Sequence, residues 1–83
     1  MPRYIVTHSI PMTEDNLKEF AEVNFPEGVS WKQTFCSFDN DKFFCEWEAP
    51  VDKVLEQILQ EAEVPFDAIY PVKIFDPLIP GLK

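Results

Sequence analysis

The sequence has very little glycine and a single histidine, which leaves several classes of site without their usual residues. Gly28 and Gly81 are the only glycines, so no glycine-rich loop is present to cradle a phosphate group. His8 is the only imidazole, and the spacing of the two cysteines matches no zinc signature. No nucleophile motif surrounds any serine. The sequence therefore contains no motif for nucleotide binding or covalent catalysis.

Basic residues are also scarce. Seven lysines and arginines stand against 15 acidic residues, which gives a formal net charge of −8. A chain this acidic repels phosphate backbones and anionic lipid headgroups, so we expect no nucleic-acid partner and no membrane partner. The N-terminus lacks the apolar stretch of a secretory signal, and no run approaches the roughly 20 apolar residues that cross a bilayer. We therefore expect a cytoplasmic protein with reduced cysteines.

Apolar and aromatic residues are abundant, at 46% and 14% of the 83 residues. This is too much apolar mass for a disordered chain, and the length suits one domain. We expect a single domain over residues 1–76 and an irregular tail over 77–83, because Pro77, Pro80 and Gly81 interrupt the tail.

Periodicity predicts two helices and four strands. Thr13 is a good N-cap, and apolar residues at helical spacing follow it up to the Phe-Pro-Glu-Gly run. A second amphipathic helix follows Pro50, with Asp52 available as its N-cap, and Val64-Pro65 stops it. The expected strand, helix, hairpin and final strand lie at residues 3–9, 13–24, 31–48 and 68–75. Pro71 is better tolerated if the final strand lies at a sheet edge.

The predicted element order is strand, helix, strand, strand, helix, strand. This is the split βαβ arrangement, so we expect an α+β fold: a ferredoxin-like βαββαβ sandwich with a four-stranded antiparallel sheet and two helices on one face. The other face of the sheet is then uncovered in a single copy.

The hairpin decides which residues lie on each face. A turn centred on Asn40-Asp41 places Cys36 opposite Cys45, and alternation puts both on the helix-facing side with Thr34, Phe38, Phe43 and Trp47. We interpret both thiols as buried core groups, although opposed strand positions could also form a disulfide, and redox chemistry or metal binding are lesser alternatives. The uncovered side receives Trp31, Gln33, Phe35, Ser37, Lys42, Phe44, Glu46 and Glu48.

An uncovered face with several aromatic residues suggests a partner or a ligand, and a twofold homodimer is the simplest solution. If Ile5 is the core residue of the first strand, His8 also lies on this face. The predicted ligand-binding residues are His8, Trp31, Gln33, Phe35, Phe44 and Glu46. The predicted metal ligands are His8, Glu46 and Glu48, whose simpler interpretation is a half-exposed strand histidine beside a solvated pair of carboxylates.

Several segments resemble a known family. They are Gly-Val-Ser-Trp-Lys-Gln-Thr-Phe from Gly28, Phe-Phe-Cys-Glu-Trp-Glu-Ala-Pro from Phe43, and Val-Pro-Phe-Asp-Ala-Ile-Tyr-Pro-Val from Val64, together with the string formed by Cys45, Glu48 and Pro50. They are similar to a family of small ferredoxin-like proteins, mostly of unassigned function, that includes a homodimeric nickel-binding protein.

The resemblance implies a ferredoxin-like homodimer and nickel or another transition metal as a candidate cofactor. The nickel-binding relative is rich in histidine, whereas this chain has non-imidazole side chains at the corresponding places: Gln33, Leu59, Val64 and Tyr70. Transition metals of this kind prefer imidazole nitrogen. The remaining candidate metal site is therefore His8 with help from Glu46 or Glu48.

Three functional hypotheses follow. The first is a non-catalytic homodimer whose uncovered sheet face forms the interface and a ligand or metal pocket. The alternative is a small cofactor-independent enzyme resembling dimeric α+β barrel oxygenases or isomerases, with His8 in a cleft between helices and sheet. The third is a plain structural or regulatory module.

Overall fold

The computed structural model describes residues 1–82 and contains the expected element order. The elements are β1 (Arg3–His8), α1 (Glu14–Ala21), β2 (Ser30–Ser37), the 3-10 turn η1 (Phe38–Asn40), β3 (Lys42–Glu48), α2 (Asp52–Glu61) and β4 (Ala68–Val72). Among these residues no helix is long and apolar enough to cross a membrane. The last residue of the predicted 77–83 tail, Lys83, lies outside the described residues.

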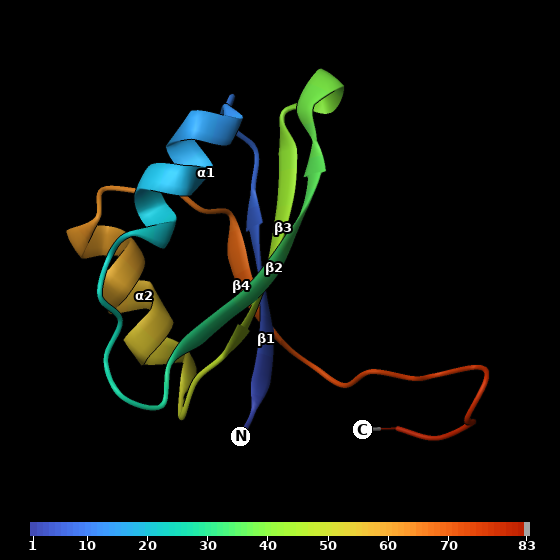
Figure 1. Ribbon diagram of the computed structural model, residues 1–83. Helices are drawn as coiled ribbons and strands as arrows, with labels where there is room; N and C mark the ends of the chain where they lie inside the picture. The colour runs from blue at the N-terminus through green and yellow to red at the C-terminus, as the bar shows by residue number, and fades with distance from the viewer. Residues whose placement is uncertain (83) are drawn as a thin grey trace.

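The four strands form one antiparallel sheet in the order β2-β3-β1-β4. Figure 1 shows α1 and α2 on the same side of this sheet. The strand order and the two-layer arrangement are those of the ferredoxin-like fold, so the predicted fold class is confirmed. β4 is an edge strand, which explains how it tolerates Pro71 in the ladder opposite Tyr4.

Both helices begin close to the expected residues, but with different caps. The Thr13 hydroxyl accepts from the Asn16 amide at 3.1 Å, and the Asn16 side chain accepts from the Thr13 amide at 3.0 Å. α1 ends at Ala21, three residues before the predicted end at 24. The cap of α2 is Val51, without a side-chain hydrogen bond, so the predicted Asp52 cap is wrong and Asp52 lies in the first turn.

The core lies between the helices and the sheet. Its largest fully buried side chains are Val6, Phe43, Trp47, Leu55 and Leu59. Aromatic rings from three segments surround Trp47, with centroid separations of 5.1 Å to Phe25, 5.7 Å to Trp31 and 5.9 Å to Phe20. Edge-to-face and offset ring pairs of this kind contribute beyond simple area burial.

The hairpin register differs from the prediction by two residues. Cys36 lies opposite Phe43, and Cys45 lies opposite Thr34. The four-residue turn is centred on Asp39-Asn40, one residue earlier than predicted, because η1 begins at Phe38 and Asp41 closes the turn in a left-handed conformation with φ of 51°. A shift of two residues preserves the face on which each side chain lies, but it separates the cysteines that we expected to be directly opposed.

A β-bulge moves Trp31 to the face opposite the one predicted. The register shifts between Trp31 and Gln33, so that Trp31 pairs with Trp47 while Gln33 pairs with Glu46. The extra residue in β2 is Lys32. Trp31 is therefore half-buried on the helix side, and its predicted place on the uncovered face is wrong.

The two cysteines lie in different environments. Cys45 is buried, and burial raises the pKa of its thiol to about 11. Cys36 is exposed, because it lies near the η1 end of the hairpin, which stands apart from both helices (Figure 1). Both are free thiols. The prediction of a buried core cysteine is confirmed for Cys45 and wrong for Cys36.

His8 also lies on the side opposite the one predicted. Tyr4 and Val6 are the core residues of β1, at 8% and 0% exposure, whereas Ile5 is half-buried on the other face. Side chains alternate along a strand, so His8 points toward the helices with Tyr4 and Val6 and is 2% exposed. The condition on which its predicted position depended, Ile5 as the core residue, is not met.

Candidate functional site

We call the sheet face away from the helices the open face. It includes these alternate residues of the four strands: Arg3, Ile5, Thr7, Gln33, Phe35, Phe44, Glu46, Glu48, Ala68, Tyr70 and Val72, with Lys32 added by the bulge. Ser37 and Lys42 continue the face toward η1, as predicted. These residues fall into a polar network at one end and an apolar region along the rest.

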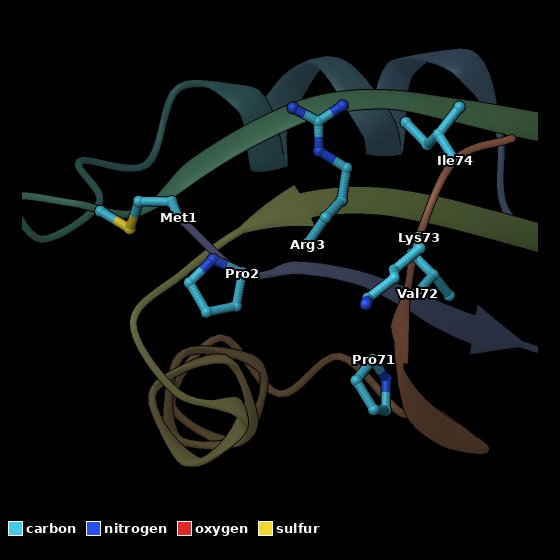
Figure 2. Close-up of a pocket in the computed structure, with 7 residues that line it drawn as sticks. All are labelled: Met1, Pro2, Arg3, Pro71, Val72, Lys73 and Ile74. Atoms are coloured by element: carbon cyan, nitrogen blue, oxygen red, sulfur yellow. The ribbon is translucent and has the colours of Figure 1, made fainter. Parts of the chain in front are cut away.

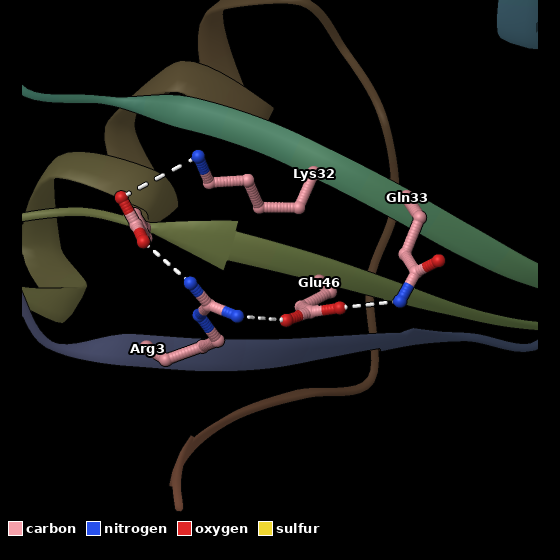
Figure 3. A network of polar contacts seen from close by, with 5 residues as sticks. Arg3, Lys32, Gln33 and Glu46 are labelled. Atoms are coloured by element: carbon pink, nitrogen blue, oxygen red, sulfur yellow. Dashed lines mark hydrogen bonds and ion pairs between the residues drawn. The ribbon is translucent and has the colours of Figure 1, made fainter. Parts of the chain in front are cut away.

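Arg3 is the centre of the polar network (Figure 3). Its Nη1 donates to Glu46 Oε2 at 2.6 Å, and its Nη2 donates to Glu48 Oε1 at 2.5 Å. Gln33 Nε2 donates to the other Glu46 oxygen at 2.7 Å, and Lys32 Nζ lies 3.6 Å from Glu48 Oε2. Every carboxylate oxygen of the network therefore faces a donor.

Strand pairing and the bulge assemble this network. Arg3 lies directly opposite Glu48, and Gln33 lies directly opposite Glu46. Cross-strand neighbours on one face are within reach of each other's side chains. The bulge then lets two consecutive residues of β2 reach the same face, so that Lys32 contacts Glu48 while Gln33 contacts Glu46.

The network is electrostatically balanced. Two cations, Arg3 and Lys32, face two carboxylates, Glu46 and Glu48, so its formal charge is zero. Hydrogen bonding from Arg3 lowers the pKa of Glu48, and the same contact raises the pKa of Arg3. Glu46 is only 6% exposed, which is tolerable for a carboxylate because both of its oxygens accept hydrogen bonds.

Aromatic side chains occupy the rest of the open face. Phe35 and Phe44 lie directly opposite each other on β2 and β3, and Tyr70 lies opposite Ile5 on β4. The three aromatic residues are 58%, 41% and 55% exposed. Exposed aromatic side chains on one sheet face are typical of a surface that contacts another molecule.

The structure brings together four of the six residues predicted to bind a ligand: Gln33, Phe35, Phe44 and Glu46. Trp31 and His8 lie on the helix side instead. The Nδ1 atom of His8 is 2.7 Å from the Pro65 carbonyl oxygen, so Nδ1 carries the proton and donates there.

The three predicted metal ligands do not form one cluster. Glu46 and Glu48 are held by Arg3 on the open face, while His8 lies on the helix side. Within residues 1–82 no group of three or more His, Cys, Asp or Glu side chains lies close enough to hold a metal ion. A metal at the two glutamates would have to displace Arg3.

Arg3, Lys32 and Tyr70 belong to the open face but were absent from the predicted site. Arg3 lies on the same side of β1 as Ile5, so the expectation that Ile5 is a core residue excludes Arg3 from the predicted site. Lys32 reaches the face only through the bulge, which a strictly alternating strand pattern does not include. Ile69 packs against the core, and Tyr70 is the next residue of the same strand. Choosing the apolar Ile69 as the core residue of the final strand would have placed Tyr70 on the open face.

A shallow hollow of about 530 Å³ lies at the Arg3 end of the sheet. Figure 2 shows its lining, which comes from the start of the chain and from the segment around the end of β4: Met1, Pro2, Arg3, Pro71, Val72, Lys73 and Ile74. Apart from Arg3 and Lys73 the lining side chains are apolar. The hollow therefore joins the polar network to the beginning of the C-terminal segment.

Comparison with known proteins places the chain in a family. The family model described as "Nickel responsive protein SCO4226-like" matches residues 4–72. The crystal structure of SCO4226 from Streptomyces coelicolor A3(2) is similar in fold, with a TM-score of 0.75 and 19% sequence identity over 89% of this chain and 99% of that one. No curated protein matches. The match over residues 4–72 shows that the chain belongs to the SCO4226-like family of nickel responsive proteins.

Proposed function

We propose that the protein is a small non-catalytic homodimer that uses the open face as its subunit interface. The observation that carries the proposal is the combination of exposed aromatic residues with a charge-neutral polar network on one uncovered face. Homodimer interfaces have an apolar centre, are enriched in aromatic residues and arginine, and satisfy their polar groups.

The charge distribution supports this face as the contact surface. Two copies of a chain with a net charge of −8 repel each other over most of their surfaces. The network on the open face contributes no net charge, because Arg3 and Lys32 balance Glu46 and Glu48. Association through this face brings no uncompensated carboxylate of the network against the second copy.

The apolar part of the face supplies the driving force. Full burial of an aromatic side chain is worth about 2 kcal/mol relative to its exposed state. Phe35, Phe44 and Tyr70 are each partly exposed in the single chain. A twofold interface buries these three residues in both copies. The Tyr70 hydroxyl can remain hydrogen-bonded at such an interface, which suits tyrosine to a surface that is wet at its rim.

The proposal keeps four of the six predicted ligand-binding residues. Gln33, Phe35, Phe44 and Glu46 lie together and would line a pocket between two copies, whereas Trp31 and His8 do not. The family description names nickel, and we propose that a metal response in this chain draws on donor groups from more than one copy. The described residues of one copy hold no cluster of three metal-ligating side chains.

The alternative enzymatic role has weaker support. It requires His8 to reach a cavity between helices and sheet, but its side chain is 2% exposed and its Nδ1 lies against Pro65. We therefore prefer the non-catalytic proposal.

Sedimentation velocity over a range of concentrations tests the proposal. The expected species has the mass of two 9.7 kDa chains. Phe35→Lys places an ammonium on the open face and should raise the dimer Kd at least tenfold. Phe38→Lys is the matched control, because Phe38 is 49% exposed but lies in η1 outside the open face. A monomer at all concentrations, or equal effects of the two substitutions, would contradict the proposal.

A further inference from the structure

The segment after β4, which we call the C-terminal arm (residues 73–82), is separate from the two-layer fold. Figure 1 shows it leaving the sheet on the side opposite the helices and extending away from the domain. It begins where the family match ends, at residue 72. The arm is therefore an addition to the segment that the family model describes, and it starts on the side of the open face.

The arm is rich in exposed apolar residues. They are Ile74 at 39%, Phe75 at 59%, Leu78 at 90%, Ile79 at 68% and Leu82 at 67% exposure. None of these five belongs to the core cluster or to the partly buried residues packed against it. A short segment with this composition is expected to bury its side chains against a surface.

The arm is already shaped into a loop. Phe75 and Leu82 form a β-bridge, the Asp76 amide donates to the Gly81 carbonyl at 3.5 Å, and the Leu78 amide donates to the Asp76 side chain at 2.9 Å. Pro77 and Pro80 restrict the backbone between these contacts. A preformed loop loses little conformational freedom on docking, which favours binding.

The dimensions of the chain agree with an arm that projects from the domain, as Figure 1 shows. The Cα radius of gyration is 13.2 Å. A compact chain of this length has a radius of gyration of about 12 Å. The arm projects in the direction in which a second copy would lie if two copies met through their open faces.

We propose that the C-terminal arm of each copy docks on the open face of the other, so that the homodimer is held by two exchanged arms. The inference rests on the proposed function and names the C-terminal arm of the second copy as the segment that covers the aromatic residues of the open face. Leu78 and Ile79 at the loop tip contact Phe35, Phe44 and Tyr70 of the second copy. Arm and face also match in charge, because Lys73 and Asp76 balance each other and the polar network is neutral.

Exchange between copies explains the arm better than a return to its own sheet. The arm leaves β4 at the edge of the sheet and heads away from it, so a return requires a reversal of direction at the residues that line the hollow. Twofold symmetry instead gives two identical arm contacts without a change in the direction of either arm.

Paramagnetic relaxation in mixed dimers tests the exchange. An unlabelled chain carries Cys36→Ser and a nitroxide on Pro80→Cys, while a second chain is ¹⁵N-labelled and has no nitroxide. Broadening of Thr7, Phe44 and Tyr70 amides in the labelled chain, without broadening of Ile58 in α2, is the expected result. Uniform broadening, or none in a sample that sediments as a dimer, would overturn the arm exchange while leaving the open-face dimer intact.

Substitution in the arm provides an independent measurement. Leu78→Asp combined with Ile79→Asp should raise the dimer Kd at least tenfold, and Val51→Asp should leave it unchanged, because Val51 is 50% exposed at the start of α2 on the other side of the sheet. An unchanged Kd for the arm variant, alongside a raised Kd for Phe35→Lys, overturns the arm exchange alone. A wild-type chain that remains monomeric overturns both proposals.

Discussion

Trp31 and Trp47 stack across β2 and β3, with ring centroids 5.7 Å apart and planes inclined by 14°. The pair exists because the bulge places both indoles on the helix side, where Phe20 covers Trp31 at 5.2 Å. The indole N–H of Trp31 also donates to the Thr34 hydroxyl at 2.8 Å. Trp31 is therefore a structural residue of the core edge.

Replacement of Trp31 by alanine should be strongly destabilising. We expect a loss of about 2 to 4 kcal/mol in the free energy of unfolding, because the substitution removes the stacked ring and leaves space beside Trp47. Phe35→Ala, on the open face, should change the free energy of unfolding of a single copy by less than about 0.5 kcal/mol. Urea unfolding at a protein concentration at which sedimentation shows a single copy measures both. Equal losses would place Trp31 on the open face.

The Arg3 network makes a pH-dependent contribution to stability. Arg3 lowers the pKa of folded Glu48 below its usual value of 4.5. The contribution is therefore complete above the pKa of the unfolded state and is lost as the pH falls through the lower pKa of the folded state. Arg3→Gln should flatten the decline of the urea midpoint between about pH 5 and pH 3. Lys18→Gln, on α1, should reproduce the wild-type slope.

The two thiols should differ sharply in reactivity. Cys36 is exposed, whereas Cys45 is buried with a pKa raised to about 11. A thiol reagent at pH 8 should modify Cys36 at least 100-fold faster than Cys45 in the folded protein, because only the thiolate reacts. Cys36→Ser should remove the fast phase, and denaturant should make the remaining thiol reactive. Two fast thiols in the native protein would contradict the observed burial.

α1 should depend strongly on its N-cap. No residue of α1 is fully buried, so packing supports this helix less than it supports α2. Thr13→Ala removes the hydroxyl that accepts from the Asn16 amide and should lower the free energy of unfolding by about 1 kcal/mol. Thr13→Ser retains the acceptor and should restore most of the loss. Thermal or urea unfolding of the three proteins measures the difference.

The element order and the fold were predictable because the signals were local and strong. Thr13 marked a helix start, α2 carried a clear apolar stripe of Leu55, Ile58 and Leu59, and Pro71 indicated an edge strand. From Gln33 to Glu48 the predicted faces of the hairpin residues are correct in spite of the incorrect register, because an error of two residues leaves a side chain on the same side. Only Trp31 and Lys32, at the bulge, lie on the opposite faces.

The candidate site was less predictable because it depends on interactions between strands. In β1, Tyr4 and Ile5 are both plausible core residues, and only the pairing with β3 and β4 selects Tyr4 and Val6. Because Tyr4 and Val6 face the core, His8 lies on the helix side and Arg3 lies on the open face. The position of the turn at η1 likewise depends on how the two strands pair, and the alternation within one strand does not encode that pairing.

The order Trp31-Lys32-Gln33 explains why the bulge is present. A regular ladder continued from the Gln33 and Glu46 pair would point the Lys32 ammonium between the helices and leave the Trp31 indole in water. One additional residue in the strand avoids this burial of an unpaired charge. Deletion of Lys32 alone would therefore leave a regular strand in which the Trp31 indole still lies on the helix side and the Gln33 amide still lies on the open face. The deleted chain would lose only the second cation beside Glu48.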